Sequence, residues 1–196
     1  MKTFLCKTCV LIVFVVFSIS AYAQSDSLKI DSLKKVLLTE KEDTNKVNTL
    51  NGLSHKYIMN LNTREKGNSI ADNALALASR LNFKKGQVEA YYNKALGFDT
   101  LEEKVKNADL SISISKEIRD TFFMFLCYNI KAHDYLYNKN YPEALNNYLI
   151  ALRLAESSGD KEELAFENLE IADVYLQTGN LPEVLKSYQN SLKVYK

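Results

Sequence analysis

Cysteine, proline and histidine are scarce in this chain of 196 residues, and each scarcity limits what the chain can do. Of its three cysteines, Cys6 and Cys9 lie in the leader segment described below. Cys127 then stands alone, and one thiol cannot form an internal disulfide. Because Cys127 lies between Leu126 and Tyr128 in a segment with helical periodicity, we expect a small buried hydrophobic side chain rather than a reactive or dimerising thiol.

The short motifs that carry catalytic and metal-binding chemistry are also missing. Beyond residue 23 there is no glycine-rich phosphate loop, no Cys-x-x-Cys, no His-Glu-x-x-His and no Gly-x-Ser-x-Gly. The two histidines, His55 and His133, are 78 residues apart and form no helical i, i+4 pair of zinc ligands. We therefore predict no catalytic site, no metal site and no cofactor. An enzyme whose active site is assembled only by the fold is the most distant alternative.

The first 23 residues have the form of an export signal rather than of a folded segment. Lys2 and Lys7 give a basic start, residues 9–17 are an uninterrupted apolar run, and residues 21–23 (Ala-Tyr-Ala) have the small-x-small form of a signal peptidase site. The run is shorter than the ~20 residues of an ordinary membrane span. We expect cleavage near Ala23, a mature chain without a membrane span, and a periplasmic or cell-surface location. An uncleaved anchor is the alternative.

Without this leader the chain is almost neutral, because 23 lysines and arginines face 24 acidic residues for a net charge of −1. A nucleic-acid-binding protein would be expected to carry a basic stripe or patch, and no cluster of useful size is present. The acidic stretches 40–43 and 160–163 also contain lysines and lie at expected helix ends, so we interpret them as solvated faces and favourable charge near helix N-termini. We expect neither a nucleic-acid partner nor a bound metal.

What the chain does have is helical periodicity, interrupted at short polar segments. These interruptions delimit an N-terminal helix within residues 24–42 and one domain of four helix pairs, residues 43–196, with no strand. The four pairs occupy roughly residues 43–82, 83–120, 121–160 and 161–196.

Both prolines stand at the same place in a repeated phrase whose two copies are displaced by 40 residues. Self-similarity at a fixed period of 20 to 50 residues is typical of stacked repeats. In each copy an asparagine precedes the proline and a glutamate follows three residues after that asparagine, which predicts a helix with an asparagine N-cap. Small residues then alternate with aromatic ones on one face of the helix, as close helix packing requires. The matched pairs are Tyr135 and Tyr175, Pro142 and Pro182, Glu143 and Glu183, Ala144 and Val184, Tyr148 and Tyr188, and Ala151 and Ser191.

This spacing resembles the tetratricopeptide repeat, a 34-residue helix-turn-helix unit with small and aromatic residues at set positions. The third and fourth pairs carry the pattern most fully, and the third departs from it at Lys131, where leucine is usual, and at Lys139, where glycine is usual. We therefore expect a less tight turn at Lys139. The period of 40 residues is similar to that of the exported tetratricopeptide regions of sensor and regulator proteins of the Bacteroidetes group.

The resemblance implies an all-α, right-handed superhelix of about four tetratricopeptide-like hairpins after an N-terminal helix. It also implies a concave groove, lined by the first helix of each pair, that holds a protein or peptide partner. The residues at the family's groove positions include Leu96 and Leu126 and, as candidate binding residues, Asn51, His55, Tyr92, Asn129, His133, Tyr137, Phe166, Asp173 and Gln177. The alternative for His55 and His133 is that they are ordinary, partly exposed polar residues.

Two functional hypotheses follow from these expectations. The first is a non-catalytic scaffold that binds a protein segment. The second is the extracytoplasmic sensory portion of a longer signalling protein, of the histidine kinase or transcriptional regulator type. We also expect self-association through the C-terminal end, where Ile171, Tyr175, Tyr188 and Leu192 would leave an open apolar face.

Overall fold

The computed structural model describes residues 28–195, and the regular structure in this range is entirely helical. Residues 28–37 form a first helix, and a short 3-10 turn, Leu61–Thr63, joins the helices of the first pair. The pairs are α2 (Thr44–Ile58) with α3 (Arg64–Arg80), α4 (Lys84–Gly97) with α5 (Leu101–Ile118), α6 (Thr121–Tyr137) with α7 (Tyr141–Ser158), and α8 (Lys161–Gln177) with α9 (Leu181–Lys193). The predicted all-α fold of four hairpins is confirmed. The leader, residues 1–23, lies outside the described residues.

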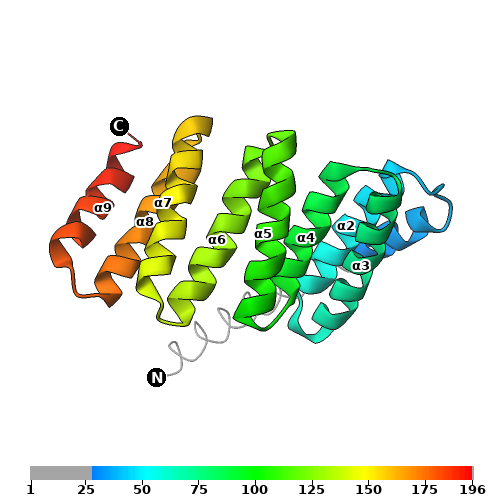
Figure 1. Cartoon of the computed structure of the whole chain (residues 1–196), viewed down its shortest axis with the longest axis horizontal. Helices are drawn as coiled ribbons and strands as arrows, with labels where there is room; N and C mark the ends of the chain where they lie inside the picture. Colours follow the sequence, from blue (N-terminus) through cyan, green and yellow to red (C-terminus); the bar gives the residue numbers. More distant parts are fainter. Residues whose placement is uncertain (1–27, 196) are drawn as a thin grey trace, which may run out of the picture.

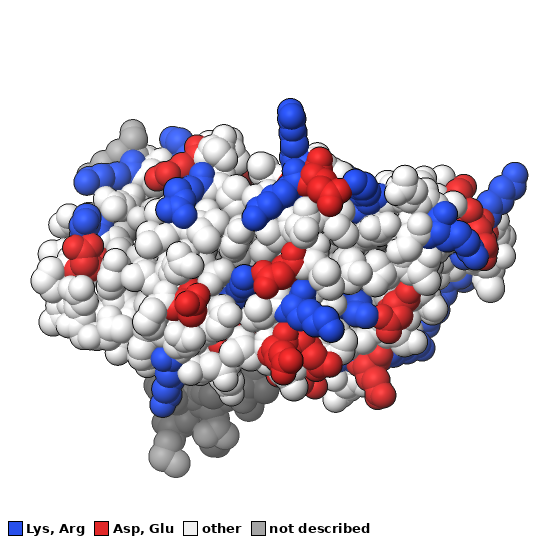
Figure 2. All heavy atoms as spheres, viewed as in Figure 1, with Lys and Arg blue, Asp and Glu red and all other residues white. Residues whose placement is uncertain are grey.

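The hairpins are stacked along the long axis of the molecule, from α2 at one end to α9 at the other (Figure 1). Each helix packs on its neighbour in the chain, and α4 also packs against α2 and α6. No comparable contact joins α6 to α8, so the row of first helices is more open between these two. None of the described helices is long and apolar enough to cross a membrane. Over the face in view, acidic and basic side chains are interspersed along the whole stack (Figure 2).

The starts of α7 and α9 agree with the predicted positions but not with the predicted hydrogen bonds. Pro142 and Pro182 lie in the first turn, where a missing amide hydrogen has no helical partner. Asn140 and Asn180 are the N-cap residues, but neither side chain accepts a hydrogen bond from the helix. Their ψ angles, 73° and 71°, differ from the extended conformation typical of a capping residue. Aspartate does cap the neighbouring α8, where Asp160 accepts from two backbone amides.

The turn at Lys139 is as tight as the glycine-containing turn, and our expectation of a looser turn was wrong. Lys139 has a left-handed φ of 60°, close to the 74° of Gly179. The Lys139 amide donates to the Leu136 carbonyl at 2.9 Å, and the Gly179 amide donates to the Leu176 carbonyl at 3.1 Å. The same turn is therefore formed with a lysine in a conformation that disfavours side chains.

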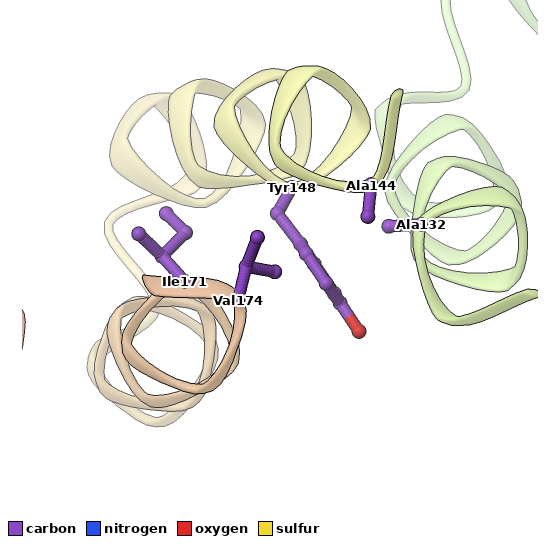
Figure 3. Close-up of a cluster of buried hydrophobic side chains, with 5 residues drawn as sticks. All are labelled: Ala132, Ala144, Tyr148, Ile171 and Val174. Carbon is purple, nitrogen blue, oxygen red and sulfur yellow. The ribbon is translucent and has the colours of Figure 1, made fainter. Parts of the chain in front are cut away.

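Close packing of small residues explains the hairpin stack. Ala132 of α6 faces Ala144 of α7, both fully buried, so the two helices approach closely (Figure 3). Tyr148 projects from α7 into the space beside α8, where it packs with Ile171 and Val174. It is the largest fully buried side chain among the described residues, and its hydroxyl donates to Glu170 Oε2 at 2.8 Å. Burial of an apolar side chain such as Ile171 or Val174 contributes about 1.5–3 kcal/mol.

Candidate functional site

A hollow of about 350 Å³ opens among the first helices of the second, third and fourth pairs. Its lining is mostly apolar and includes four polar side chains. The lining residues are Tyr92, Ala95 and Leu96 of α4, Lys104 of α5, Leu126, Asn129, Ile130, His133 and Asp134 of α6, and Phe166 of α8.

The spacing of the α6 residues explains why they share the hollow. Leu126, Asn129, Ile130 and His133 follow one another at helical i, i+3 and i+4 intervals, so their side chains project from one face of the helix. Leu126 and Ile130 are half-buried, whereas the His133 side chain is 68% exposed. The hollow therefore has an apolar floor and a solvated rim.

An ion pair forms one wall of the hollow. Lys104 Nζ of α5 and Asp134 Oδ1 of α6 are 2.7 Å apart, and both side chains are largely buried. The pair joins a second helix to the next first helix across 30 residues of sequence. Because both charges are already paired, this wall is polar but locally neutral.

At the N-terminal side of the hollow, three aromatic rings are in contact. His55 of α2 stacks on Tyr92, with ring centroids 6.2 Å apart, and Phe123 of α6 meets Tyr92 edge-on at 5.4 Å. Burial lowers the pKa of His55, although Asn93 Oδ1 at 3.3 Å favours the charged ring. Burial, with smaller effects from Cys127 and Glu89, raises the pKa of Tyr92 to about 12. Near neutral pH this corner therefore presents an uncharged imidazole and a protonated phenol.

Asn51, predicted in the groove, is instead fully buried between α2 and α4. Its amide donates to the Gly86 carbonyl at 3.0 Å, and Asn93 donates to the Asn51 carbonyl at 2.9 Å. These bonds pair the side-chain amide hydrogen and the backbone carbonyl of Asn51 and join α2 to α4, while Asn51 Oδ1 has no hydrogen-bond partner.

Of the predicted groove residues, the structure brings Tyr92, Asn129, His133 and Phe166 together in one hollow, and His55 joins them through its contact with Tyr92. Besides Asn51, three predicted residues lie outside the hollow. Tyr137 is 86% exposed, Gln177 is exposed, and Asp173 is half-buried on α8.

Lys104, Ile130 and Asp134 were missed by the sequence analysis. Ile130 and Asp134 lie on α6 at positions other than the family's groove positions, and Lys104 comes from a second helix. Ile130 could have been found from the sequence, because it lies four residues after Leu126 and therefore on the same face of the helix. The ion pair of Lys104 with Asp134 could not, because it depends on how α5 packs against α6.

Beside the hollow lies a buried carboxylate without a hydrogen-bond partner. Glu167 of α8 is fully buried, and neither of its oxygens accepts a hydrogen bond of good geometry. The Asn129 amide is near enough to lower the pKa of Glu167, but this amide donates to the Phe125 carbonyl at 3.3 Å. Burial is the larger effect and, with the charges of Glu170 and Glu163, raises the pKa of Glu167 to about 7.

The described part of the chain was also compared with the requirements of metal sites and reactive thiols. Between residues 28 and 195, no group of three or more His, Cys, Asp or Glu side chains could hold a metal ion. Cys127 is fully buried against Ala108 and Ile112 of α5, and burial raises the pKa of its thiol to about 12. Such a thiol is not a nucleophile near neutral pH.

No protein-family model matches the chain, and no curated protein is significantly similar to it. Solved structures with similar folds were found at low sequence identity. A signal transduction ATPase with numerous domains from Pyrococcus horikoshii, which has a tetratricopeptide repeat sensor, matches 85% of this chain with a TM-score of 0.73 and 20% identity. A Rap protein complexed with the competence and sporulation factor matches 89% with a TM-score of 0.74 and 14% identity.

The tetratricopeptide-like repeats of a kinesin light chain from Podospora anserina match 89% of this chain and 89% of their own length, with a TM-score of 0.67 and 12% identity. By contrast, the chain spans only 26% of the ATPase and 51% of the Rap protein. At these identities the likeness concerns the fold. Across residues 28–195 the chain has the fold of a tetratricopeptide-repeat superhelix.

Proposed function

We propose that this protein is a non-catalytic interaction scaffold that binds an extended or helical segment of another protein in the hollow between α4, α6 and α8. The observation that carries the proposal is the apolar floor of the hollow within a polar rim. Leu96, Leu126 and Phe166 contribute apolar surface, while Asn129 and His133 place hydrogen-bonding groups beside it. A few polar groups around an apolar recess are what orient a bound ligand in most binding sites.

The size of the hollow indicates how a partner would be held. Its volume of about 350 Å³ is at the lower end of the range of roughly 300–1,000 Å³ for ligand pockets. It therefore suits one or two apolar side chains of a segment that continues along the row of first helices. Helix-in-groove recognition uses such anchor residues. The Rap protein of similar fold was solved with a bound factor, which is consistent with this use of the fold.

Selection from a displayed library of random peptides on the immobilised full-length protein tests the proposal. We expect enriched peptides whose binding is lost in Leu126→Glu, because a carboxylate would be buried in the apolar floor. The matched control is Leu110→Glu, which places the same group on a partly exposed position of α5 outside the hollow. Peptides that bind equally to wild type and Leu126→Glu would count against the hollow as the binding site.

A sensory role in a longer, exported signalling protein is the second candidate. It is supported by the ATPase of similar fold, in which the repeats form a sensor and of which this chain spans 26%. Sequencing the gene region downstream tests it: a reading frame that continues into a membrane helix and an output domain is expected, and an immediate stop codon would refute it.

We further propose that the protein self-associates through the outer face of α9. Of the four residues expected at this end, Tyr188 and Leu192 are exposed, whereas Ile171 is buried beside Tyr148 and Tyr175 packs against the same cluster. Five residues at 3- and 4-residue intervals form an apolar stripe there, namely Leu181, Leu185, Tyr188, Leu192 and Tyr195. The stripe corresponds, 40 residues earlier, to a stripe of α7 that is packed against α8. Tyr148 of that stripe is fully buried, whereas its counterpart Tyr188 is 41% exposed. A stripe with this heptad-like spacing is self-complementary in a pair of helices.

Sedimentation velocity tests this second surface. We expect wild-type protein to form dimers that dissociate in the double variant Leu185→Lys, Leu192→Lys, while Leu110→Lys leaves them intact. A wild-type protein that stays monomeric at the highest soluble concentration would refute self-association through α9.

A further inference from the structure

The helix on the C-terminal side of the hollow is strongly acidic. α8 carries five acidic residues and one lysine, and the lysine is its first residue. Three of the acids, Glu167, Glu170 and Asp173, recur every third residue. Burial raises the pKa of the Tyr148 hydroxyl, and so do its hydrogen bond to Glu170 and the charges of Glu170, Glu167 and Asp173. Three carboxylates therefore converge on the region between α7 and α8 near Tyr148.

Three buried oxygen atoms behind the hollow have no hydrogen-bond partner. They are Asn129 Oδ1 and both carboxylate oxygens of Glu167. One hydrogen of the Asn129 side-chain amide is donated to the Phe125 carbonyl, and the Tyr148 hydroxyl donates to Glu170. Unpaired buried acceptors are costly, about 1–3 kcal/mol each.

Nearby basic side chains are paired with other acids. Lys104 pairs with Asp134, and Lys131 pairs with Asp109 of α5 at 2.7 Å. His133 Nε2 lies 3.6 Å from Glu170 Oε2, on the exposed rim of the hollow. Glu170 and Asp173 follow Phe166 on α8 at i, i+4 and i+7, so they lie on the face of this helix that borders the hollow, and a histidine rather than a lysine stands beside Glu170.

We propose that the hollow selects a basic, apolar segment of a partner protein, which places an apolar side chain between Tyr92, Leu126 and Phe166 and directs a lysine or arginine side chain toward Glu170 and Asp173. This inference rests on the proposed scaffold function. Lysine and arginine carry several donors and no acceptor, which complements an acceptor-rich wall. Charge-assisted hydrogen bonds of this kind are roughly twice as strong as neutral ones. Complementary charge mainly gives specificity and rate of association.

The peptides enriched on the full-length protein test this preference by their composition and by their response to two double variants. Glu170→Gln with Asp173→Asn removes the rim charges, and glutamine at 170 keeps an oxygen that can accept from Tyr148. Glu102→Gln with Glu156→Gln removes the same charge from exposed positions of α5 and α7. The readout is fluorescence polarisation of a labelled enriched peptide and of a version in which each lysine or arginine is replaced by glutamate.

We expect the enriched peptides to combine apolar and basic residues. Replacing their basic residues by glutamate should weaken binding at least about tenfold at low salt, as opposite charges become like charges. The rim variant should weaken binding of the basic peptide about two- to fivefold per charge removed, and the control variant should not. The difference between the basic and acidic peptides should shrink in 1 M salt, where the Debye length falls to about 3 Å.

The outcomes separate this inference from the proposed function. Enriched peptides that depend on Leu126 but carry no basic bias would overturn the charge preference and leave the scaffold function standing. Selection without any Leu126-dependent peptide would overturn both. Displacement of the basic peptide by an equal concentration of spermidine would show that a free polyamine, not a protein segment, is the cation preferred at the rim.

Discussion

Glu167 makes the stability of this protein depend on pH in a way that one substitution should remove. Burial and neighbouring acids raise its pKa from 4.5 to about 7. The folded chain therefore holds a proton that the unfolded chain releases, and the free energy of unfolding falls as pH rises from 4.5 through about 7. At 1.36 kcal/mol per pKa unit, this group costs up to about 3 kcal/mol at pH 8. Glutamine has the same shape and no charge to bury.

We therefore expect Glu167→Gln to be more stable than wild type by up to about 3 kcal/mol at pH 8, with a difference that shrinks toward zero near pH 4.5. Urea unfolding followed by circular dichroism at half-unit steps of pH measures the difference directly. Exposed Glu162 on the same helix supplies the control, Glu162→Gln.

Comparison of the variant with wild type at each pH cancels the other titrating groups. Burial also raises the pKa of Glu89, which acts in the same direction as Glu167, and burial lowers the pKa of His55, which stabilises the fold as pH rises. A stability difference that is constant across pH, or a wild type that is the more stable protein at pH 8, would refute the reasoning. Either result would mean that the Glu167 carboxylate is ionised and well paired in the folded chain.

Three further outcomes are expected. Lys139→Gly should stabilise the protein by about 1 kcal/mol because Lys139 has a left-handed φ, and Gly179→Ala should destabilise it by a similar amount. A denaturation midpoint that neither substitution changes would show that the left-handed backbone of a lysine carries no strain here. Ala144→Leu should cost roughly 1–3 kcal/mol by overpacking the contact with Ala132, and unchanged thermal stability would show that this contact is not tight. N-terminal sequencing of protein from the cell envelope should begin after Ala23, whereas intact Met1 would refute export.

Patterns among residues close together in the sequence were sufficient to predict the stack of four helical hairpins. Helical periodicity, the 40-residue displacement and the two prolines each act through residues close in the chain, and they predicted four hairpins that the structure confirms. The turn at Lys139 shows the limit of such reasoning. A lysine is locally unfavourable there, but packing of α6 on α7 holds the same turn that glycine forms before α9.

The groove positions of the tetratricopeptide repeat lie on the helices that form the hollow, and Tyr92, Asn129, His133 and Phe166 meet there. Which side chain is open to a ligand, however, was decided by packing between pairs. Asn51 is closed off by a hydrogen bond to Gly86, 35 residues away, and the wall of Lys104 and Asp134 spans 30 residues. Nothing in the sequence distinguishes Glu167 from the other acidic residues of its helix, yet the stacked helices bury it completely. Periodicity specifies which residues share a face, whereas burial and pairing depend on the helices that the superhelix brings against that face.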